Sequence, residues 1–360
     1  MIAARQLALT AVGAFIALSL YFLCRVSPSR PQWSSPSTHF LVPDTHGVNY
    51  NDTCPTPDYS VHCCRGKARS IGFQAEEHMH YTVDEQAEIR TEFYLRELLV
   101  SLMPLATPNL GCFLGFEGDS LMADTFMAMV CQLKMIGYSQ QDCIPIVGGS
   151  SYKDGETNAS LPCEEPQKRA VALMANSSTC PKITLAYFAQ MANKPALPFL
   201  SSLPPEDLQK NLTFIVNWGV HGNNQAALKT SLEQLAVVFS NYTDRFGVRL
   251  LWKETEAQHF GYSTTGLYDV NENSTLPFTK NTSICAPFTN YTAANWRNKL
   301  VLDMMGNGTF PRLPVISYFS ESDRFFFLHG SYKDCTHYTY APFKFEKLWH
   351  QVATFLALPM

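Results

Sequence analysis

The sequence predicts an α/β protein, a three-layer sandwich in which helices pack on both sides of a mainly parallel β-sheet. Two observations lead to this prediction. Short apolar segments of strand character alternate along the chain with amphipathic segments of helical periodicity, a pattern typical of α/β layer folds. The composition, with 46% hydrophobic and 16% charged residues, also provides ample apolar material for a core.

The first predicted helix covers Val83–Met103, where apolar residues recur near helical spacing and the pattern stops before Pro104. An apolar strand at 112–117 leads directly into a helix at 121–136. Lys153–Asn193 is rich in loop residues, so we expect no regular element there. The remaining predicted elements are strands at 144–147, 212–218, 248–252 and 315–319, and helices at 226–239, 293–305 and 342–356.

The N-terminal 50 residues are expected to lie outside the folded domain. Leu7–Cys24 is an uninterrupted run of 18 apolar or small residues, just long enough to span a bilayer. A cleaved signal peptide is the alternative, but no small-x-small cleavage site precedes Arg25. We therefore expect a cytoplasmic tip and signal anchor at 1–25, a Ser/Pro-rich stem at 26–50 and a lumenal domain at 51–360.

Glycosylation motifs indicate the orientation of this domain. Nine Asn-x-Ser/Thr motifs without an intervening Pro predict entry into the secretory lumen and solvent-facing loops around each asparagine. They begin at Asn51, Asn158, Asn176, Asn211, Asn241, Asn273, Asn281, Asn290 and Asn307. We expect a single-pass type II membrane protein of the Golgi or secretory pathway, or a secreted protein if the anchor is cleaved.

The cysteines are also typical of an oxidising compartment. The chain has 11 Cys; Cys24 lies in the anchor, and the ten that remain are an even number that predicts disulfides. Their pairing cannot be deduced from the sequence. The alternative is that some are buried free thiols, and Cys112 and Cys131, on apolar elements, are the best candidates for these.

Charge and motifs argue against several classes of partner. The net charge of −4, with no Lys/Arg block, provides no basic field for nucleic acid. The chain has no HExxH, no CxxC pair and no phosphate loop, so neither a metal nor a nucleotide is expected. His78 and His80, beside Glu76 and Glu77, could ligate a metal, but a solvated polar turn is the simpler interpretation without a third ligand.

Ser120 is the central candidate for chemistry. In Gly118-Asp119-Ser120 an apolar strand turns into a helix, which exposes the serine hydroxyl at a helix N-terminus whose dipole favours developing negative charge. A serine nucleophile also needs an imidazole to accept its proton and a carboxylate to orient that imidazole. Asp334 and His337, three residues apart in a predicted turn, can supply both. The sequence therefore predicts a Ser120–His337–Asp334 catalytic triad.

Further candidates follow from the rule that functional loops lie at the carboxyl ends of parallel strands. The rule places Ser120, the 217–224 loop, the 254–259 loop and the 334–337 loop on one rim of the sheet. Candidate donors to an oxyanion are the backbone N–H groups of Ser120 and Gly219 and the side chain of Asn217, Asn223 or Asn224. Asn217 at a strand end could equally be a satisfied turn residue.

Two other histidines compete with His337 for the role of base. His221 and His259 follow the two strands nearest the predicted rim, where they could bind substrate or only hydrogen-bond within the loops. We prefer His337 because it alone has a carboxylate at a fixed short spacing.

These residues resemble those of the GDSL/SGNH hydrolase superfamily. Gly118-Asp119-Ser120-Leu121 and Asp334-Cys335-Thr336-His337 are similar to its signature segments, and more narrowly to those of the PC-esterase branch, which includes the trichome-birefringence-like polysaccharide O-acetyltransferases. Three more segments resemble that branch, namely Phe214–His221, Trp252–Phe260 and Tyr318–Arg324. The resemblance covers about Cys112 to Leu356. It implies an SGNH-hydrolase-like fold and acyl transfer to or from a glycan.

The chain departs from the pattern of that branch near both signature segments. The branch carries Arg and Asn soon after its Gly-Asp-Ser-Leu, whereas this chain has Met122-Ala123-Asp124-Thr125. The second Cys, the Trp and the Gly that follow the Asp-Cys-x-His of the branch are missing between Tyr338 and Pro342. Triad chemistry survives these changes, but plant-type polysaccharide recognition does not follow from them.

The leading hypothesis is a serine enzyme of the secretory lumen that transfers an acyl group, expected to be acetyl, to a glycan or hydrolyses it from one. We expect no bound cofactor, although a transferase needs an acyl donor; the expected partners are a glycan or glycoconjugate and, through residues 7–24, the membrane. The alternative is a catalytically inactive glycan-binding or interaction ectodomain on the same scaffold. A third interpretation, a disulfide-bonded structural surface protein, predicts that Ser120 and His337 lie far apart.

Overall fold

The computed structural model describes residues 85–145, 169–175, 179–189, 196–209, 212–222, 224–260, 285, 288, 290–326, 329–331, 334–338 and 342–358. For a few of these, Asp334 among them, only the backbone is described. The predicted anchor and stem, and the histidines at 78 and 80, lie outside these residues. Within the described residues, no helix is both long and apolar enough to cross a membrane.

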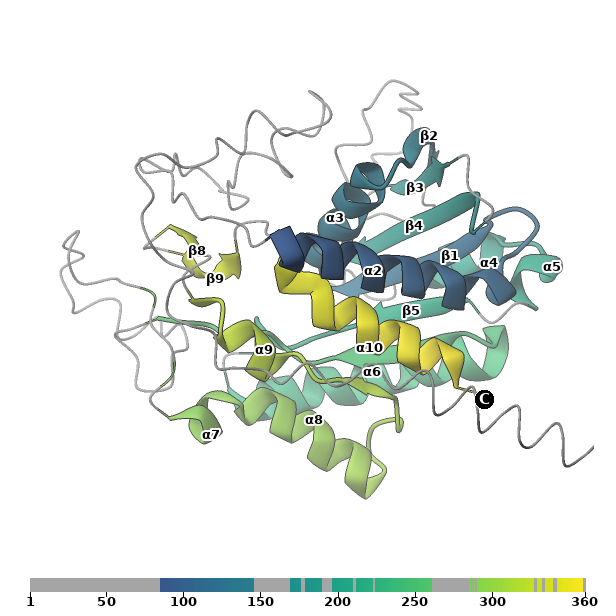
Figure 1. Cartoon of the computed structure of the whole chain (residues 1–360). Helices are drawn as coiled ribbons and strands as arrows, with labels where there is room; N and C mark the ends of the chain where they lie inside the picture. The colour runs from purple at the N-terminus through teal and green to yellow at the C-terminus, as the bar shows by residue number, and fades with distance from the viewer. Residues whose placement is uncertain are drawn as a thin grey trace, which may run out of the picture.

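A seven-stranded mixed sheet runs through the molecule (Figure 1). Strands β4, β1, β5, β6 and β7 are parallel to their neighbours in that series, whereas β3 pairs antiparallel with both β2 and β4. In spatial order the strands are β2 (Ser139–Pro145), β3 (Arg169–Met174), β4 (Lys182–Ala189), β1 (Cys112–Gly118), β5 (Thr213–Val216), β6 (Arg249–Lys253) and β7 (Val315–Ile316). This mostly parallel sheet with its helices confirms the predicted α/β class.

Three helices cover one face of the sheet. Leu114 and Phe116 of β1 point into an apolar core that they share with α2 (Glu85–Leu102), α3 (Ser120–Met135) and α10 (Glu346–Ala357). Helices α2 and α10 pack side by side across this face (Figure 1). The last described helix of the chain therefore packs against the first.

Three other helices cover the opposite face, because side chains alternate between the two sides of each strand. Phe113 of β1 and Phe214 of β5 point into a second apolar core. This core is shared with α4 (Ala196–Ser202), α6 (Gln225–Phe246) and α8 (Trp296–Asn307). The sheet of the described residues is thus buried on both sides, which is typical of parallel strands.

Shorter elements connect these layers. They are the helices α5 (Pro205–Leu208), α7 (Tyr291–Ala294) and α9 (Phe319–Asp323), the 3₁₀ turns η4 (Met103–Leu105) and η8 (Pro342–Phe345), and an antiparallel pair of strands, β8 (His329–Ser331) and β9 (Asp334–Tyr338). The β8–β9 pair and α9 precede η8 and α10 in the chain.

The predicted loop-rich stretch at 153–193 contains two strands of the sheet, so that prediction is wrong for its described part. Strand β4 pairs with β1 along the whole of β1, from Cys112–Ile183 to Gly118–Ala189. The apolar run of β4 is short and stands among Ser, Thr, Pro and glycosylation motifs, which hide its strand character in the sequence. Its burial between β3 and β1 explains why it is nevertheless a strand.

Two further predictions are corrected. The 334–337 segment is part of strand β9 and not a turn. The predicted strand at 315–319 ends at Ile316, and a helix begins at Phe319. The carboxylate of Glu254 explains the second change, because its Oε2 accepts the backbone N–H groups of Tyr318 and Phe319 (2.8 and 2.9 Å) and so favours a helix start.

Disulfides are present, as the cysteine count predicts. Cys112 of β1 bonds to Cys180 just before β4, and Cys285 bonds to Cys335 of β9. Cys131 is also disulfide-bonded. The alternative in which Cys112 and Cys131 are free thiols is therefore wrong.

Three of the nine glycosylation asparagines lie among the described residues, and all three are exposed. Asn290 caps α7 and Asn307 ends α8, whereas Asn241 lies within helix α6 rather than in the predicted loop. Asn290 and Asn307 use their Oδ1 atoms in hydrogen bonds, an arrangement compatible with a glycan on Nδ2. The other six, Asn51, Asn158, Asn176, Asn211, Asn273 and Asn281, lie outside the described residues.

Candidate active site

The carboxyl ends of three neighbouring parallel strands meet at one edge of the sheet. Strand β1 pairs with β5, and β5 pairs with β6, so the segments that follow them emerge side by side. This confirms the predicted convergence of Ser120 with the segments 217–222 and 254–259. Strand β9 reaches the same edge, where the carbonyl oxygen of Cys335 accepts the backbone N–H of His259 (2.9 Å).

At this edge Ser120 and His337 form a hydrogen bond. Their Oγ and Nε2 atoms lie 2.6 Å apart although the residues are 217 positions apart in the chain. Both side chains are partly exposed to solvent. Ser120 is the first residue of α3, so its backbone N–H lies at the positive end of the helix dipole. The interpretation as a purely structural surface protein predicted a wide separation of these residues, and that prediction is wrong.

Asp119 builds the turn that presents Ser120. One carboxylate oxygen accepts the backbone N–H of Leu121 (3.1 Å) and thereby caps α3, and the other accepts the N–H of Val220 in the loop after β5 (3.3 Å). Burial raises the pKa of Asp119, while His221 and other partners oppose the shift. The middle residue of the Gly-Asp-Ser triplet thus ties the serine turn to a neighbouring loop.

The turn also depends on close backbone approach. A Cβ atom at Gly118 would lie 2.8 Å from the carbonyl oxygen of Asn217 and 2.9 Å from Cβ of Met122, so a larger residue does not fit. From β4, the hydroxyl of Tyr187 donates to the carbonyl oxygens of Gly118 and Asp119 (3.2 and 3.0 Å). The position of Ser120 is therefore held from both strands that flank β1.

The predicted oxyanion donors are of two kinds, backbone N–H groups and asparagine side chains, and the structure argues against the side chain of Asn217. Gly219 lies in the loop after β5, and a Cβ atom there would be 2.2 Å from Oγ1 of Thr255. Asn217, by contrast, uses its Nδ2 atom to donate to the carbonyl oxygen of Lys253 (2.8 Å) and to Thr255 (3.2 Å). Both hydrogen bonds of the Asn217 Nδ2 group are therefore made to the 253–255 segment, which agrees with the alternative of a satisfied turn residue and leaves no donor for an oxyanion.

The other two asparagines are not placed as oxyanion donors either. Asn224 caps α6, because its Oδ1 accepts the backbone N–H of Ala227 (2.8 Å). Asn223 lies outside the described residues. The backbone N–H groups of Ser120 and Gly219 are therefore the candidate oxyanion donors that remain among the described residues.

The two competing histidines have different environments. His221 is exposed at the edge of the site, with its ring centroid 6.3 Å from that of Trp218. His259 is fully buried, and both of its ring nitrogens are in hydrogen bonds with Asp323 and His329. Of the two roles considered for His259, the structure shows hydrogen bonding within the loops, and its burial argues against contact with substrate.

Strand β9, which carries His337, is attached to the 254–260 segment. The hydroxyl of Tyr338 donates to the carbonyl oxygen of Ala257 (2.6 Å), and Nε2 of Gln258 donates to Oγ1 of Thr336 (2.9 Å). Only the backbone of Asp334 is described, and it lies in β9. Because this segment is a strand, a spacing of three residues no longer argues for contact between Asp334 and His337, and that contact stays a prediction.

A buried arginine that the sequence analysis did not single out joins two loops of the site. Arg297 of α8 donates through Nε to the carbonyl oxygen of Gly222 (3.1 Å) and through Nη1 to Oε1 of Gln258 (3.2 Å). Burial lowers the pKa of Arg297 to about 10, and the nearby Asp119 opposes the shift. No motif surrounds Arg297 in the sequence, so only its fold position reveals it.

A second missed feature is a fully buried charge network beside the site. The two carboxylate oxygens of Glu256 bind Nζ of Lys253 (2.6 Å) and of Lys344 (2.5 Å). Burial alone would raise the pKa of Glu256, but the two lysines lower it to about 2. Nζ of Lys344 also lies 3.8 Å from the ring centroid of Tyr338, a cation–π contact.

The geometry defines a class of site, in which a serine at a helix N-terminus forms a hydrogen bond with an imidazole through its hydroxyl group. Such a pair can transfer the serine proton to the imidazole as the oxygen attacks an electrophile. No family model and no curated protein matches this chain. A functional assignment therefore depends on the site itself.

Proposed function

We propose that the chain is a serine-dependent acyl-transfer enzyme of the SGNH-hydrolase type. The observation that carries the proposal is the 2.6 Å hydrogen bond between Ser120 Oγ and His337 Nε2. The placement of Ser120 after a buried strand and at the start of α3 also supports it. A three-layer, SGNH-like arrangement of the sheet and helices is part of the same proposal.

In the first half of the reaction, His337 Nε2 takes the Ser120 proton while Oγ attacks the acyl carbonyl. The carbonyl oxygen becomes an oxyanion, to which the N–H groups of Ser120 and Gly219 are proposed to donate. The imidazolium then gives its proton to the departing alkoxide, which leaves an acyl-Ser120 ester. Asp334 is proposed to orient the His337 ring and stabilise its charge.

In the second half, His337 removes a proton from an incoming hydroxyl group, whose oxygen attacks the ester carbonyl. The bond from Ser120 Oγ to the acyl group then breaks, and the imidazolium returns its proton to Oγ, which regenerates Ser120. The incoming group is water in an esterase and a sugar hydroxyl in a transferase. The choice depends on how well water is excluded from the acyl-enzyme. A transferase would use an acyl donor as a substrate and needs no bound cofactor.

The proposed substrate and compartment derive from the sequence. The resemblance to PC-esterases implies an acetyl group and a glycan. The nine glycosylation motifs, the disulfides and the predicted anchor at 7–24 favour a membrane-attached enzyme of the Golgi or secretory pathway, with residues 51–360 in the lumen. A secreted form is the alternative if the anchor is cleaved.

Fluorophosphonate labelling of the full, glycosylated chain tests the proposal. The wild type is expected to be labelled at Ser120, and Ser120→Ala to lose all labelling at that position. His337→Ala is expected to slow labelling by about 1,000-fold or more, because the general base is lost. Ser231→Ala is the control, since Ser231 lies partly exposed on α6 and its loss should leave labelling unchanged.

An intact chain that is not labelled would contradict the acyl-transfer proposal. The alternative, an inactive glycan-binding or interaction ectodomain, predicts glycan binding that persists in Ser120→Ala and no change in glycan acylation when the gene product is removed. Comparison of glycan acetylation with wild-type and Ser120→Ala protein therefore separates the two.

A further inference from the structure

A continuous chain of hydrogen bonds runs from α9 to the residue proposed as the base. Asp323 Oδ1 lies 3.1 Å from His259 Nε2, and His259 Nδ1 lies 2.7 Å from His329 Nε2. His329 Nδ1 lies 2.8 Å from the backbone carbonyl oxygen of His337. The chain therefore ends on the residue whose side chain bonds to Ser120.

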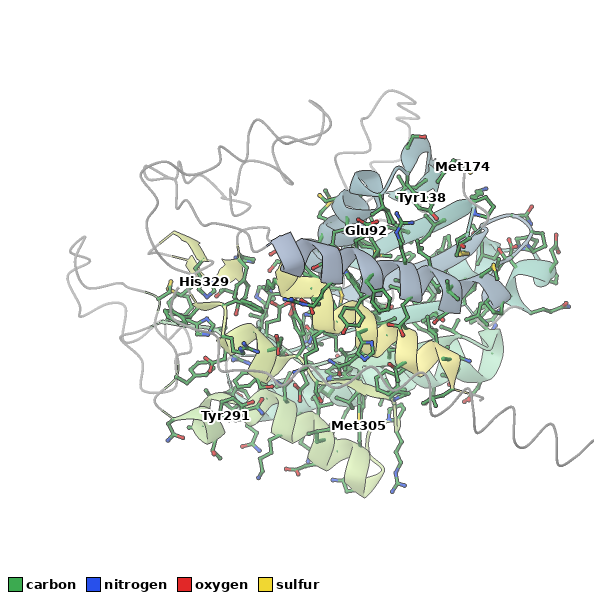
Figure 2. The ribbon with its side chains drawn as sticks, viewed as in Figure 1. Glu92, Tyr138, Met174, Tyr291, Met305 and His329 are labelled. Atoms are coloured by element: carbon green, nitrogen blue, oxygen red, sulfur yellow. A yellow bond between two sulfur atoms is a disulfide. The ribbon has the colours of Figure 1, made fainter. Side chains whose placement is uncertain are left out.

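Both histidines of this chain are buried. His259 is 0% and His329 5% exposed, and Figure 2 shows His329 on β8. Aromatic rings enclose them, with Phe288 stacked on His259 (5.3 Å between centroids) and Tyr338 beside His329 (4.3 Å). Water is thus a poor substitute for any hydrogen bond that the chain loses.

The number of protons in this chain of hydrogen bonds follows from the groups at its two ends. At one end stands a carboxylate and at the other a carbonyl, and both only accept hydrogen bonds. Three hydrogen bonds between these ends need three protons, but two neutral imidazoles beside an ionised carboxylate have only two. One additional proton is therefore required, wherever along the chain it resides, and without it one of the three bonds is lost.

The short distance between the two rings argues against a shared metal. Two nitrogens bound to one tetrahedral zinc ion, each at about 2.0–2.1 Å, lie about 3.3 Å apart. His259 Nδ1 and His329 Nε2 are 2.7 Å apart, which is a hydrogen-bond distance.

We propose that Asp323, His259 and His329 form a positioning relay for His337. The relay carries one proton beyond two neutral imidazoles and holds the His337 carbonyl, so that the His337 ring points at Ser120 Oγ. This inference rests on the proposed function, in which His337 is the base. None of the three relay residues touches the reacting atoms, so they act through the backbone of β9.

The charged groups around the relay set the direction of its pH dependence. Asp323 is the carboxylate that faces it, and Lys344 in η8 is the cation that acts on His259; the remaining neighbours named above are aromatic. Burial lowers the pKa of His259, Asp323 opposes that shift, and Lys344 adds to it. The extra proton is consequently lost as the pH rises, and we expect the clamp on His337 to loosen in that direction.

Substitution of Asp323 provides a sharp test, because the two obvious variants differ in their protons. An amide at 323 can donate to His259 Nε2, so Asp323→Asn completes all three hydrogen bonds with neutral imidazoles and gives up only a long 3.5 Å contact from Phe288 N–H. Asp323→Ala removes the first partner. Both are to be compared with wild type in the hydrolysis of p-nitrophenyl acetate across pH.

The ratio of the Asp323→Asn rate to the wild-type rate is expected to rise with pH, since the variant has no proton to lose. Asp323→Ala is expected to lower kcat tenfold or more with KM unchanged. His329→Gln, which lacks a donor at the Nδ1 position, should behave like Asp323→Ala. Asp303→Asn on the exposed face of α8 is the control for loss of one carboxylate and should match wild type at every pH.

If Asp323→Asn and Asp323→Ala behave alike, or the rate ratio is flat with pH, the relay proposal is overturned. Nitrogen NMR of histidine-labelled Ser120→Ala protein reads the ring protons without any activity. Three protonated ring nitrogens, or two with a protonated Asp323, support the relay, and two neutral rings beside an ionised carboxylate contradict it. If fluorophosphonate fails to label the wild type while the Ser120→Ala spectrum shows an intact relay, the proposed function alone is contradicted.

Discussion

Glu117 is a buried carboxyl group two positions before Asp119 in the strand that leads to the serine turn. The Tyr242 hydroxyl donates to its Oε1 (3.3 Å), and its Oε2 has no hydrogen-bond partner among the described residues. Burial raises the pKa of Glu117 to about 8, with the Tyr242 hydrogen bond in opposition. The group is therefore mostly neutral at neutral pH.

This raised pKa predicts a pH-dependent stability. Below the ordinary pKa of 4.5 the folded and unfolded states both hold the proton; between 4.5 and about 8 only the folded state does, so stability falls as the pH rises. Glu117→Gln resembles the neutral form and should remove this fall. The difference, on the order of a few kcal/mol at pH 8, is measurable by urea unfolding across pH, and parallel wild-type and variant curves would contradict the prediction.

Single residues were the easiest level to predict from the sequence. Ser120 and His337 belong to short patterns with a known chemical logic, and the structure brings their side chains together. Asn217 and His259 were harder, because a polar residue at a strand end looks the same whether it faces substrate or a neighbouring loop. The hydrogen bonds that Asn217 and His259 make to neighbouring loops can be recognised only in the three-dimensional structure.

At the scale of elements, the N-terminus of α3 depends on the side chain of a single residue, Asp119. Asp119→Ala removes the cap on Leu121 N–H and the tie to Val220, and should destabilise the protein by about 1–2 kcal/mol. Because the serine turn loosens, labelling of Ser120 should slow as well. Asp119→Asn keeps an oxygen for the cap and should lose less of both. Urea unfolding and fluorophosphonate labelling measure the two effects.

A matched control is Asn224→Ala, which removes the cap of α6. It should cost a similar amount of stability but leave the labelling rate near that of wild type. Equal slowing of labelling in the two variants would mean that general stability, and not the serine turn, determines reactivity.

Element types were predictable where the periodic pattern was long, as in α2, α6 and α10. Strand β4 was missed because its signal is one short apolar run in a segment full of loop residues, and its strand conformation comes from pairing with β1 and β3. The sequence predicts a turn at 334–337, but pairing with β8 makes this segment a strand. Both errors concern tertiary contacts that overrule local preference.

At the scale of the whole molecule, Glu256 joins parts of the chain that are distant in sequence. Lys253 ends β6 and Lys344 lies in η8, and both bind the same buried carboxylate. Glu256→Gln leaves two buried ammonium groups without a counter-charge and should destabilise the protein by about 3–5 kcal/mol. Glu233→Gln, on the exposed face of α6, should change stability very little and serves as the control.

The lowered pKa of Glu256 gives the opposite pH trend to Glu117. Its folded-state pKa is about 2 against an ordinary 4.5, so its contribution is present above 4.5 and is lost as the pH falls toward 2. Taken together, the two groups favour greatest stability near pH 4.5–5. Denaturation midpoints measured from pH 3 to 8 check this, and a maximum above pH 7 would contradict it.

The position of β1 inside the sheet has a consequence for how the protein is made. The strand that precedes Ser120 lies between β4 and β5, which are synthesised later, and His337 follows all seven strands of the sheet in the chain. A growing polypeptide therefore holds an incomplete sheet, and Ser120 lacks its histidine partner, until β9 has been synthesised. A ribosome-bound intermediate that ends before β9 should be inert toward acyl groups, so the order of synthesis itself delays the reactive pair.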